Sequence, residues 1–287
     1  MVMDAKKLLS LPPRIIRHSY TRRDTMLYAL GVGAGQDADE RELRFVYEDG
    51  LQALPTMAVI LAYPGFWQKE PQYGIDWRRV LHVEQSVVLH APLPVEGEVV
   101  GELTMDSIID KGSGKGALLH STRRVTDAAT GELLATVRQV SFLRGDGGCG
   151  GSTATPSAPR PMPDCAADAE MFLTTRSEQA LLYRLSGDYN PLHADPRVAR
   201  DVGLGRPILH GLCTFGIAGR ALLRLICGDD PRRMVRMDCR FTAPVYPGDR
   251  LLVKVWRGSE GRASFQVLAP ERDVVVLNHG YLKFLPE

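Results

Sequence analysis

The 287-residue sequence lacks the features that mark several large classes of protein. Its five cysteines form no CxxC pair and are odd in number, which argues against a cysteine-bound zinc and against a disulfide framework. Its longest apolar run, residues 57–63, is far shorter than the roughly 20 residues that span a bilayer. It shows neither the apolar core of a signal peptide nor a final Ser-Lys-Leu. We therefore expect a cytoplasmic protein without membrane insertion.

The sequence also lacks an excess of either charge. Thirty-five basic and 34 acidic residues leave a formal charge of +1. The chain therefore lacks the large positive net charge that attracts nucleic acid, and no nucleic-acid partner is expected. A hydrophobic fraction of 44% and a charged fraction of 24% are typical of globular proteins. The length exceeds that of a usual single domain, which favours two domains or a fused pair.

A segment rich in Gly, Ser, Thr, Ala and Pro divides the chain nearly in half, and we interpret it as a linker. The two halves resemble each other at three places in the same order, which favours an internal duplication. The matched pairs are 27–31 with 182–187, 54–56 with 209–211, and 91–98 with 243–249. The predicted organisation is a first repeat over 1–143, a linker over 144–164 and a second repeat over 165–287.

Each half is predicted to contain short helices followed by strands. Thr175-x-x-Glu178 and Thr21-x-x-Asp24 read as capping boxes, each opening a short helix. Residues 211–226 are apolar on most sides, which predicts a buried helix. Strand-like runs occupy 81–89, 99–109, 117–125, 133–143, 237–243, 250–256, 263–268 and 274–284. Helices followed by a block of strands indicate an α+β fold, in which an antiparallel sheet covers a helix.

Polar side chains are concentrated in the stretch LSGDYNPLHAD, residues 185–195. Within six residues, Asp188, Asn190 and His193 can accept, orient and transfer protons, so they form a candidate general acid/base set. Loops that follow a helix are common places for such groups. In the alternative interpretation, Asp and Asn serve only as turn or capping residues.

Gly211 opens the predicted buried helix. The first N–H groups of a helix lack intrahelical partners and the helix dipole favours negative charge, so the Gly211 N–H is a candidate oxyanion donor. A packing role at a crowded helix start is the alternative.

Three stretches carry a resemblance to a known family: SGDYNPLH (186–193), PILHGLCTFG (207–216) and RFTAPVYPG (240–248). The chain resembles hydratase 2 of the MaoC-like dehydratase group over nearly its whole length. This resemblance implies a double hotdog fold of two fused repeats, each a long helix wrapped by an antiparallel sheet. It also implies that the first repeat is non-catalytic and accommodates the acyl tail. Its loop, GVGAGQD over 31–37, indeed lacks an acid/base set.

The resemblance also implies roles for individual residues. Asp188 and His193 match the family's catalytic dyad, Asn190 its orienting amide and Gly211 the donor to the thioester carbonyl. Positions that contact the CoA ester correspond to His82, Lys111, Tyr189 and Phe241, although Val83 stands where the family has glycine. Glu48 matches an acidic auxiliary position.

The activity implied is that of an (R)-specific 2-enoyl-CoA hydratase, a hydro-lyase that reversibly adds water to trans-2-enoyl-CoA in acyl-CoA metabolism such as β-oxidation. No metal and no separate cofactor are expected, since CoA enters with the substrate. The expected partner is a small-molecule acyl-CoA, and the chain is a monomer or a homodimer. A hotdog thioesterase, an acyl-carrier-protein dehydratase and a non-catalytic acyl-CoA binding protein remain as alternatives.

Overall fold

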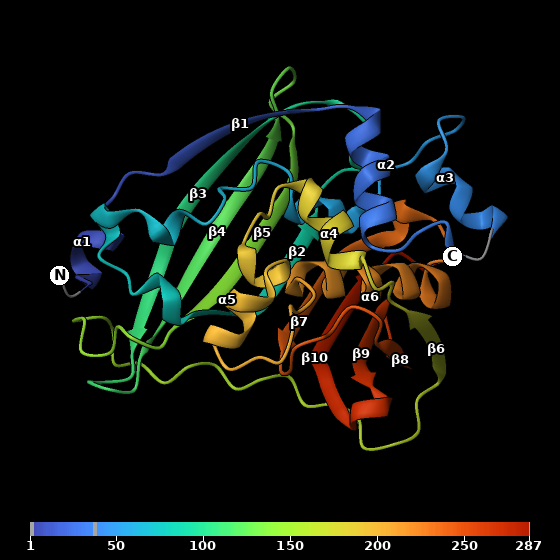
Figure 1. Cartoon of the computed structure of the whole chain (residues 1–287). Coiled ribbons are helices and arrows are strands. Elements are labelled where there is room, and N and C mark those ends of the chain that lie inside the picture. Colours follow the sequence, from blue (N-terminus) through green and yellow to red (C-terminus); the bar gives the residue numbers. More distant parts are fainter. Residues whose placement is uncertain (1–2, 37–38, 287) are drawn as a thin grey trace.

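The computed structural model describes residues 3–36 and 39–286, and within these ranges no helix is long and apolar enough to cross a membrane. In the same part of the chain, ten strands form a single antiparallel sheet (Figure 1). The strands are β1 (Arg14–Tyr20), β2 (Val80–Leu89), β3 (Gly97–Asp110), β4 (Ala117–Asp127), β5 (Leu133–Leu143), β6 (Ala169–Thr174), β7 (Met234–Phe241), β8 (Arg250–Arg257), β9 (Arg262–Ala269) and β10 (Val274–Phe284).

The strand order shows two equivalent halves. From one edge the order is β1-β3-β4-β5-β2, and from the other edge it is β6-β8-β9-β10-β7, the same sequence of positions. The halves join where β2 pairs antiparallel with β7, and there the Ser86 hydroxyl donates to the Asp238 carboxylate at 2.6 Å. The predicted α+β double hotdog fold is confirmed, with its two sheets side by side.

Within residues 3–36 and 39–286, the long central helix is present in the second repeat only. It is α6, Gly211–Ile226, and almost all of its residues are buried. In the first repeat the corresponding place holds η3, a 3-10 helix over Pro55–Val59. The expectation of a long helix in each repeat is therefore wrong for the first. A longer helix is prevented at Ala62, whose φ of +50° is left-handed, and at Pro64 two residues later, which has no N–H to donate to a helix.

The first repeat approaches α6 closely. A Cβ on Gly216 would lie 2.5 Å from a methyl of Val32, and one on Gly219 would lie 2.5 Å from a methyl of Thr56. These two positions are glycine because α6 packs against elements of the first repeat, and buried side chains from both repeats share one large core.

The two short helices begin differently. At α2 (Arg22–Gly31) the Asp24 carboxylate accepts the Thr21 N–H at 2.8 Å, as the predicted capping box requires. At α4 (Gln179–Tyr183) the predicted capping box is wrong, because the Thr175 hydroxyl donates instead to the Asp249 carbonyl at 2.9 Å.

Part of the predicted linker belongs structurally to the first repeat. Cys149 is buried in a second apolar cluster with the N-terminal segment, and Ser152 forms a bridge with Ile109 of β3. The Asp110 carboxylate accepts the N–H groups of Gly148 and Gly150 at 2.8 and 3.0 Å. The connection between the repeats follows these contacts and leads to β6 (Figure 1). The remaining elements are α1 (Ala5–Leu9), η2 (Glu40–Glu42), α3 (Leu43–Val46), η4 (Trp67–Lys69), η5 (Pro71–Tyr73), η6 (Trp77–Arg79), η7 (Arg184–Ser186), η8 (Pro191–His193), α5 (Pro196–Asp201), η9 (Pro231–Arg233) and η10 (Pro270–Arg272).

Candidate active site

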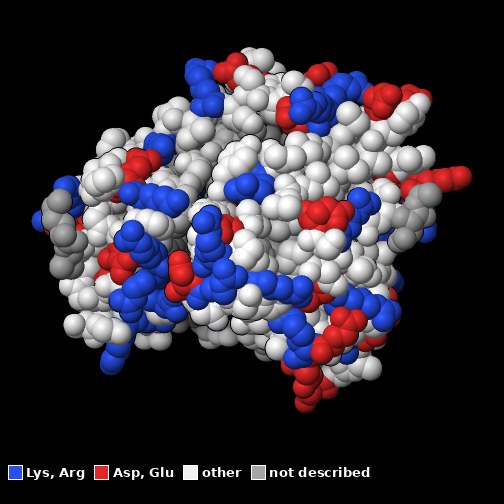
Figure 2. Space-filling model, in the orientation of Figure 1, with Lys and Arg blue, Asp and Glu red and all other residues white. Residues whose placement is uncertain are grey.

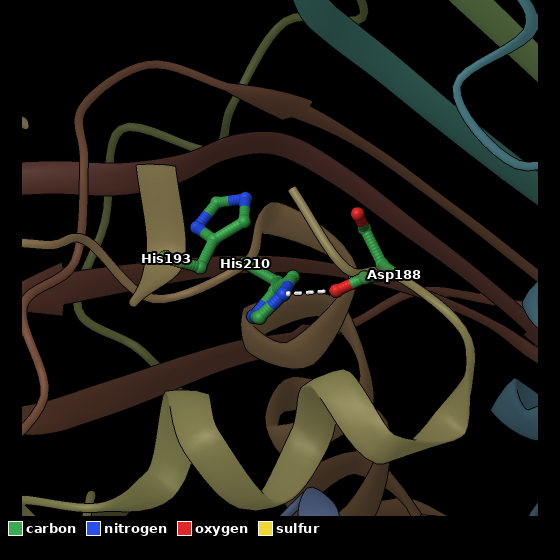
Figure 3. Close-up of side chains that lie close together, drawn as sticks. All are labelled: Asp188, His193 and His210. Atoms are coloured by element: carbon green, nitrogen blue, oxygen red, sulfur yellow. Dashed lines mark hydrogen bonds between the residues drawn. The ribbon is translucent and has the colours of Figure 1, made fainter. Parts of the chain in front are cut away.

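The polar loop of the second repeat brings Asp188 and His193 together. The chain leaves η7 through Gly187, whose φ of +117° favours glycine, and re-enters a short helical turn at η8. Both side chains project to the same side of the loop, as Figure 3 shows. Potential ligand atoms of Asp188, His193 and His210 all lie within 4.8 Å of one another. The spacing is suitable for proton transfer through a substrate or a water.

The imidazole of His193 is oriented by the backbone. Its Nδ1 lies 2.9 Å from the carbonyl oxygen of Ile208. Because a carbonyl only accepts, Nδ1 carries the hydrogen and Nε2 is left as the basic nitrogen. Burial lowers the pKa of His193, against the opposing effect of the Asp188 charge. The ring is therefore neutral near pH 7, which is the state a general base requires.

His210 supports both members of this pair, a role that no local pattern of residues predicts. Its ring stacks on that of His193 with centroids 3.7 Å apart and an interplanar angle of 28°. Its Nε2 donates to the backbone carbonyl of Asp188 at 3.1 Å (Figure 3). Burial, followed by the neighbouring His193, lowers the pKa of His210 to about 2. His210 is thus a neutral ring packed beneath the reactive groups.

Asn190 has a local structural role that the alternative interpretation anticipated. Its side-chain oxygen accepts the N–H of Leu192 at 3.1 Å and caps η8, and its own N–H donates to the Asp188 carboxylate at 3.2 Å. These two bonds fix the turn that carries both catalytic candidates. The side-chain NH₂ of Asn190 has no hydrogen bond to any residue within 3–36 or 39–286.

Gly211 is the first residue of α6, directly after His210. A Cβ at this position would lie 3.2 Å from the ring of Phe241. A methyl at this position would have to displace the Phe241 ring slightly, so packing favours glycine, and the Gly211 N–H, as the first of a helix, has no intrahelical acceptor. The two interpretations of Gly211 from the sequence are compatible.

Two of the predicted CoA-ester contacts adjoin this helix start. The rings of His82 and Phe241 meet edge to face with centroids 4.8 Å apart, and the Nε2 of His82 lies 3.0 Å from the Glu84 carbonyl. Burial lowers the pKa of His82 to about 4, so this ring is neutral. His82, Phe241 and Gly211 thus form a continuous surface built from both repeats.

The other predicted contacts lie at the surface. Tyr189 is 61% exposed, and the guanidinium carbon of Arg184 lies 5.4 Å from the centroid of the Tyr189 ring. Lys111 is exposed after β3, with its ammonium 4.7 Å from the centroid of the Phe142 ring. In the described part of the chain, neither side chain forms a hydrogen bond, ion pair or ring contact with Asp188 or His193.

Asp188, His193 and His210 could also hold a metal ion, since each offers one ligand atom. The His193 Nδ1 and the His210 Nε2 are engaged with backbone carbonyls, so a metal would use the Asp188 carboxylate and the opposite nitrogen of each ring. One carboxylate and two imidazoles are common ligands of transition metals.

Two protein families match the chain in the order of its repeats. The MFE-2 hydratase 2 N-terminal domain matches residues 18–145, and the MaoC like domain matches residues 160–278. The 3-hydroxyacyl-thioester dehydratase Y of Mycobacterium tuberculosis is 40% identical over 275 residues, which cover 93% of each chain. The chain belongs to the MaoC-like dehydratase family.

Further relatives agree with this membership along the whole chain. The peroxisomal enoyl-CoA hydratase 2 of Arabidopsis thaliana is 38% identical and covers 91% of this chain and 89% of its own. The solved MaoC-like dehydratase of Phytophthora capsici superposes with a TM-score of 0.87 at 33% identity, covering 98% and 99% of the two chains.

In the first repeat of the chain, the loop equivalent to the active-site loop is bonded to α6. Arg220 donates to the Val32 carbonyl at 2.9 Å and forms a buried ion pair with Glu42 at 2.6 Å, and Glu42 accepts the Gly35 N–H at 2.8 Å. Asp37, which closes the predicted loop, lies outside the described residues. The described loop residues, 31–36, carry no acid/base set.

Glu48 does not join the site. It lies on an exposed turn after α3, and its backbone carbonyl accepts from Arg22. Its carboxylate has no hydrogen bond to the residues that the structure describes. Glu42 is the acid of this region that is largely covered, with a side chain 13% exposed, and sequence reasoning missed it because its partner Arg220 is far away in the chain.

Proposed function

We propose that the protein is an (R)-specific 2-enoyl-CoA hydratase, which reversibly converts a trans-2-enoyl-CoA into a (3R)-3-hydroxyacyl-CoA. The observation that carries the proposal is the neutral, buried imidazole of His193, which turns its basic nitrogen to the same side as Asp188 beside the start of α6. Relatives named as enoyl-CoA hydratase 2 and as a 3-hydroxyacyl-thioester dehydratase support it.

The proposed reaction distributes one water over two carbons. Asp188, in its protonated form, delivers a proton to C2 while the Nε2 of His193 takes a proton from the water whose oxygen bonds to C3. Return of that proton from His193 to Asp188 restores both groups for the next turnover. The Gly211 N–H and the α6 dipole stabilise the negative charge that develops on the thioester oxygen. The two protonation steps belong to the pair as a unit, because closely spaced groups titrate together.

The substrate brings its own phosphates, which need basic partners at the surface. Figure 2 shows basic side chains, with acidic ones among them, gathered across the lower middle of the face that carries α5. We assign the CoA phosphates to exposed basic side chains such as Lys111 and Arg206, and the acyl tail to the first repeat. No separate cofactor is included in the proposal.

The test is hydration of crotonyl-CoA and trans-2-decenoyl-CoA, measured as the loss of the enoyl-thioester absorbance. Chiral analysis of the product then identifies its configuration. Wild type should yield the (3R) product, and Asp188→Asn and His193→Gln should each lower kcat by roughly 10²–10⁴. Asp195→Asn is the matched control, because Asp195 lies close in sequence but is engaged with Arg197 at the surface. Release of free thiol without hydration would indicate a thioesterase, and unchanged absorbance together with binding would indicate a non-catalytic protein.

Three further points belong to the proposal. Comparing rates on CoA and acyl-carrier-protein thioesters identifies the carrier of the substrate. Fractionation tests the proposed cytoplasmic location against that of relatives named peroxisomal. Light scattering distinguishes the monomer from the homodimer.

A further inference from the structure

A cavity of about 700 Å³ lies away from the candidate active site, at the opposite end of the central strands. The active-site end holds His82 near the start of β2 and Phe241 at the end of β7, whereas the cavity adjoins Leu89 at the end of β2 and Met234 at the start of β7. Seven residues of strand separate His82 from Leu89, a span of about 23 Å. Cavities of this volume accommodate small molecules.

The position of this cavity follows from the duplication. The pairing of β2 with β7 is antiparallel, so the two repeats are related by an approximate two-fold axis between these strands. Ala91 and Pro92 after β2 correspond to Ala243 and Pro244 after β7. The residue before each Ala-Pro pair makes the same bond, since the N–H of His90 donates to Leu134 and that of Thr242 to Val276.

The same correspondence relates the lining of the cavity to the active site. When Ala91-Pro92 is aligned with Ala243-Pro244, His82 corresponds to Met234 and Phe241 corresponds to Leu89. Met234 and Leu89 therefore line the cavity where His82 and Phe241 line the active site. In the matched stretches 54–56 and 209–211, Pro55 corresponds to His210, the residue directly before α6, and Pro55 also lines the cavity. The cavity therefore occupies the position at which the first repeat would have its own active site.

The described side chains that line this second position include no acid/base pair like Asp188 and His193, and most of them are apolar. Leu51, Leu89, Leu93, Met234 and Leu285 line the cavity. Of its lining, His90 is engaged with the Thr136 hydroxyl at 2.9 Å, and none of the described residues that line the cavity carries a carboxylate. Arg232 is the cation of the lining, with a side chain that is 73% exposed and bonded to Asp230 at 2.8 Å. The lining suits an extended apolar chain with a negative end near Arg232.

We propose that this cavity is a second, non-hydrating binding site for a fatty acyl chain with an anionic end, either a free fatty acid or an acyl-CoA. The site is the first repeat's counterpart of the active site, and it binds without turnover. The proposal rests on the duplication and on the lining of the cavity, and it holds whichever reaction the second repeat catalyses.

The test counts binding events by calorimetry with laurate and, separately, with decanoyl-CoA, a saturated ester that cannot be hydrated. Ala91→Trp places an indole in the cavity, and Leu43→Trp adds the same group at an exposed position as the control. With at least one ligand, wild type and Leu43→Trp should show one more binding event per chain than Ala91→Trp. A difference with laurate identifies the free acid as sufficient, and a difference with decanoyl-CoA alone identifies the CoA ester.

Arg232→Glu gives a second readout that does not fill the cavity. It should weaken the additional binding event about fivefold or more, because it replaces an attraction by a repulsion of similar size. Hydration of crotonyl-CoA by Ala91→Trp serves as a check of folding and separates this proposal from the proposed reaction. The proposal is overturned if wild type and Ala91→Trp bind the same number of laurate molecules and the same number of decanoyl-CoA molecules per chain. If Ala91→Trp does not fold, the proposal is overturned when Arg232→Glu leaves the affinity for each ligand unchanged.

Discussion

The ring of His210 lies stacked on the ring of His193, with centroids 3.7 Å apart. Both rings are buried, and burial is the main cause of the lowered pKa of each. Two protonated imidazoles at this distance would repel each other in a medium that solvates neither. The fold therefore holds the pair neutral, and this has a consequence for stability.

We expect acid to destabilise the protein through these histidines. The pKa of His210 is about 2 in the folded protein, whereas that of an unfolded histidine is near 6.5. Between these two pH values, His210 binds a proton only when the protein is unfolded. Stability is thus full above about pH 6.5 and falls as the pH is lowered. Between about pH 7.5 and pH 5, His210 alone should account for about 2 kcal/mol. Urea unfolding of wild type and His210→Asn at both pH values measures it, and an equal loss in both proteins would contradict the assignment.

A second prediction concerns Gly211. In Gly211→Ala the new methyl meets the Phe241 ring at 3.2 Å, and overpacking of this kind costs about 1–3 kcal/mol. Gly211→Ala/Phe241→Leu should recover most of the unfolding free energy, because the smaller side chain makes room. If the Gly211 N–H holds the thioester oxygen, kcat/KM of the double variant should remain below that of Phe241→Leu alone, since the methyl still obstructs the approach to that N–H. Recovery of both quantities together would assign Gly211 to packing alone.

The strands that sequence reasoning missed show where local patterns lose information. β1 and β6 are the two edges of the sheet, and in both the burial alternates between half-buried and exposed for nearly the whole length. Arg14, Arg17 and His18 in β1 and Glu170 in β6 dilute the apolar signal of these strands. Edge strands in general carry such polar residues. The eight interior strands, which have buried faces, were predicted to within a few residues.

The active-site loop was predictable from residue types, whereas its supports were not. Asp188, Asn190 and His193 are close in sequence, so their convergence follows from one turn. His210 supports that turn from 17 positions beyond His193, and Thr175 bonds to Asp249 rather than to its own helix. These partners are determined by tertiary contacts, which local patterns do not encode.

A third prediction concerns metal. Asp188, His193 and His210 have the composition of a metal site, but the proposed reaction uses two of them for proton transfer. Dialysis against EDTA should therefore leave the rate of crotonyl-CoA hydration unchanged, and Zn²⁺ added in excess should inhibit by occupying the base nitrogen of His193. Loss of activity on dialysis, with recovery on adding a metal, would replace the acid/base mechanism by a metal-assisted one.

The fourth prediction tests how the repeats are held together. Arg220 of α6 and Glu42 of the first repeat form a buried ion pair, with side chains 7% and 13% exposed. Glu42→Gln leaves the guanidinium without a counter-charge and should cost about 3–5 kcal/mol, and Arg220→Met should cost a similar amount for the opposite reason. The double variant should lose clearly less than the sum of the two, because it removes both buried charges at once.

Denaturant unfolding of the four proteins gives the coupling energy directly, with Glu48→Gln as the exposed control that should change stability by less than about 0.5 kcal/mol. Additive losses would mean that the pair contributes no mutual stabilisation. Since Arg220 also holds the Val32 carbonyl, the same variants show whether the first-repeat loop affects catalysis. A kcat that is unchanged per folded molecule would show that this ion pair stabilises the fold without positioning Asp188 and His193.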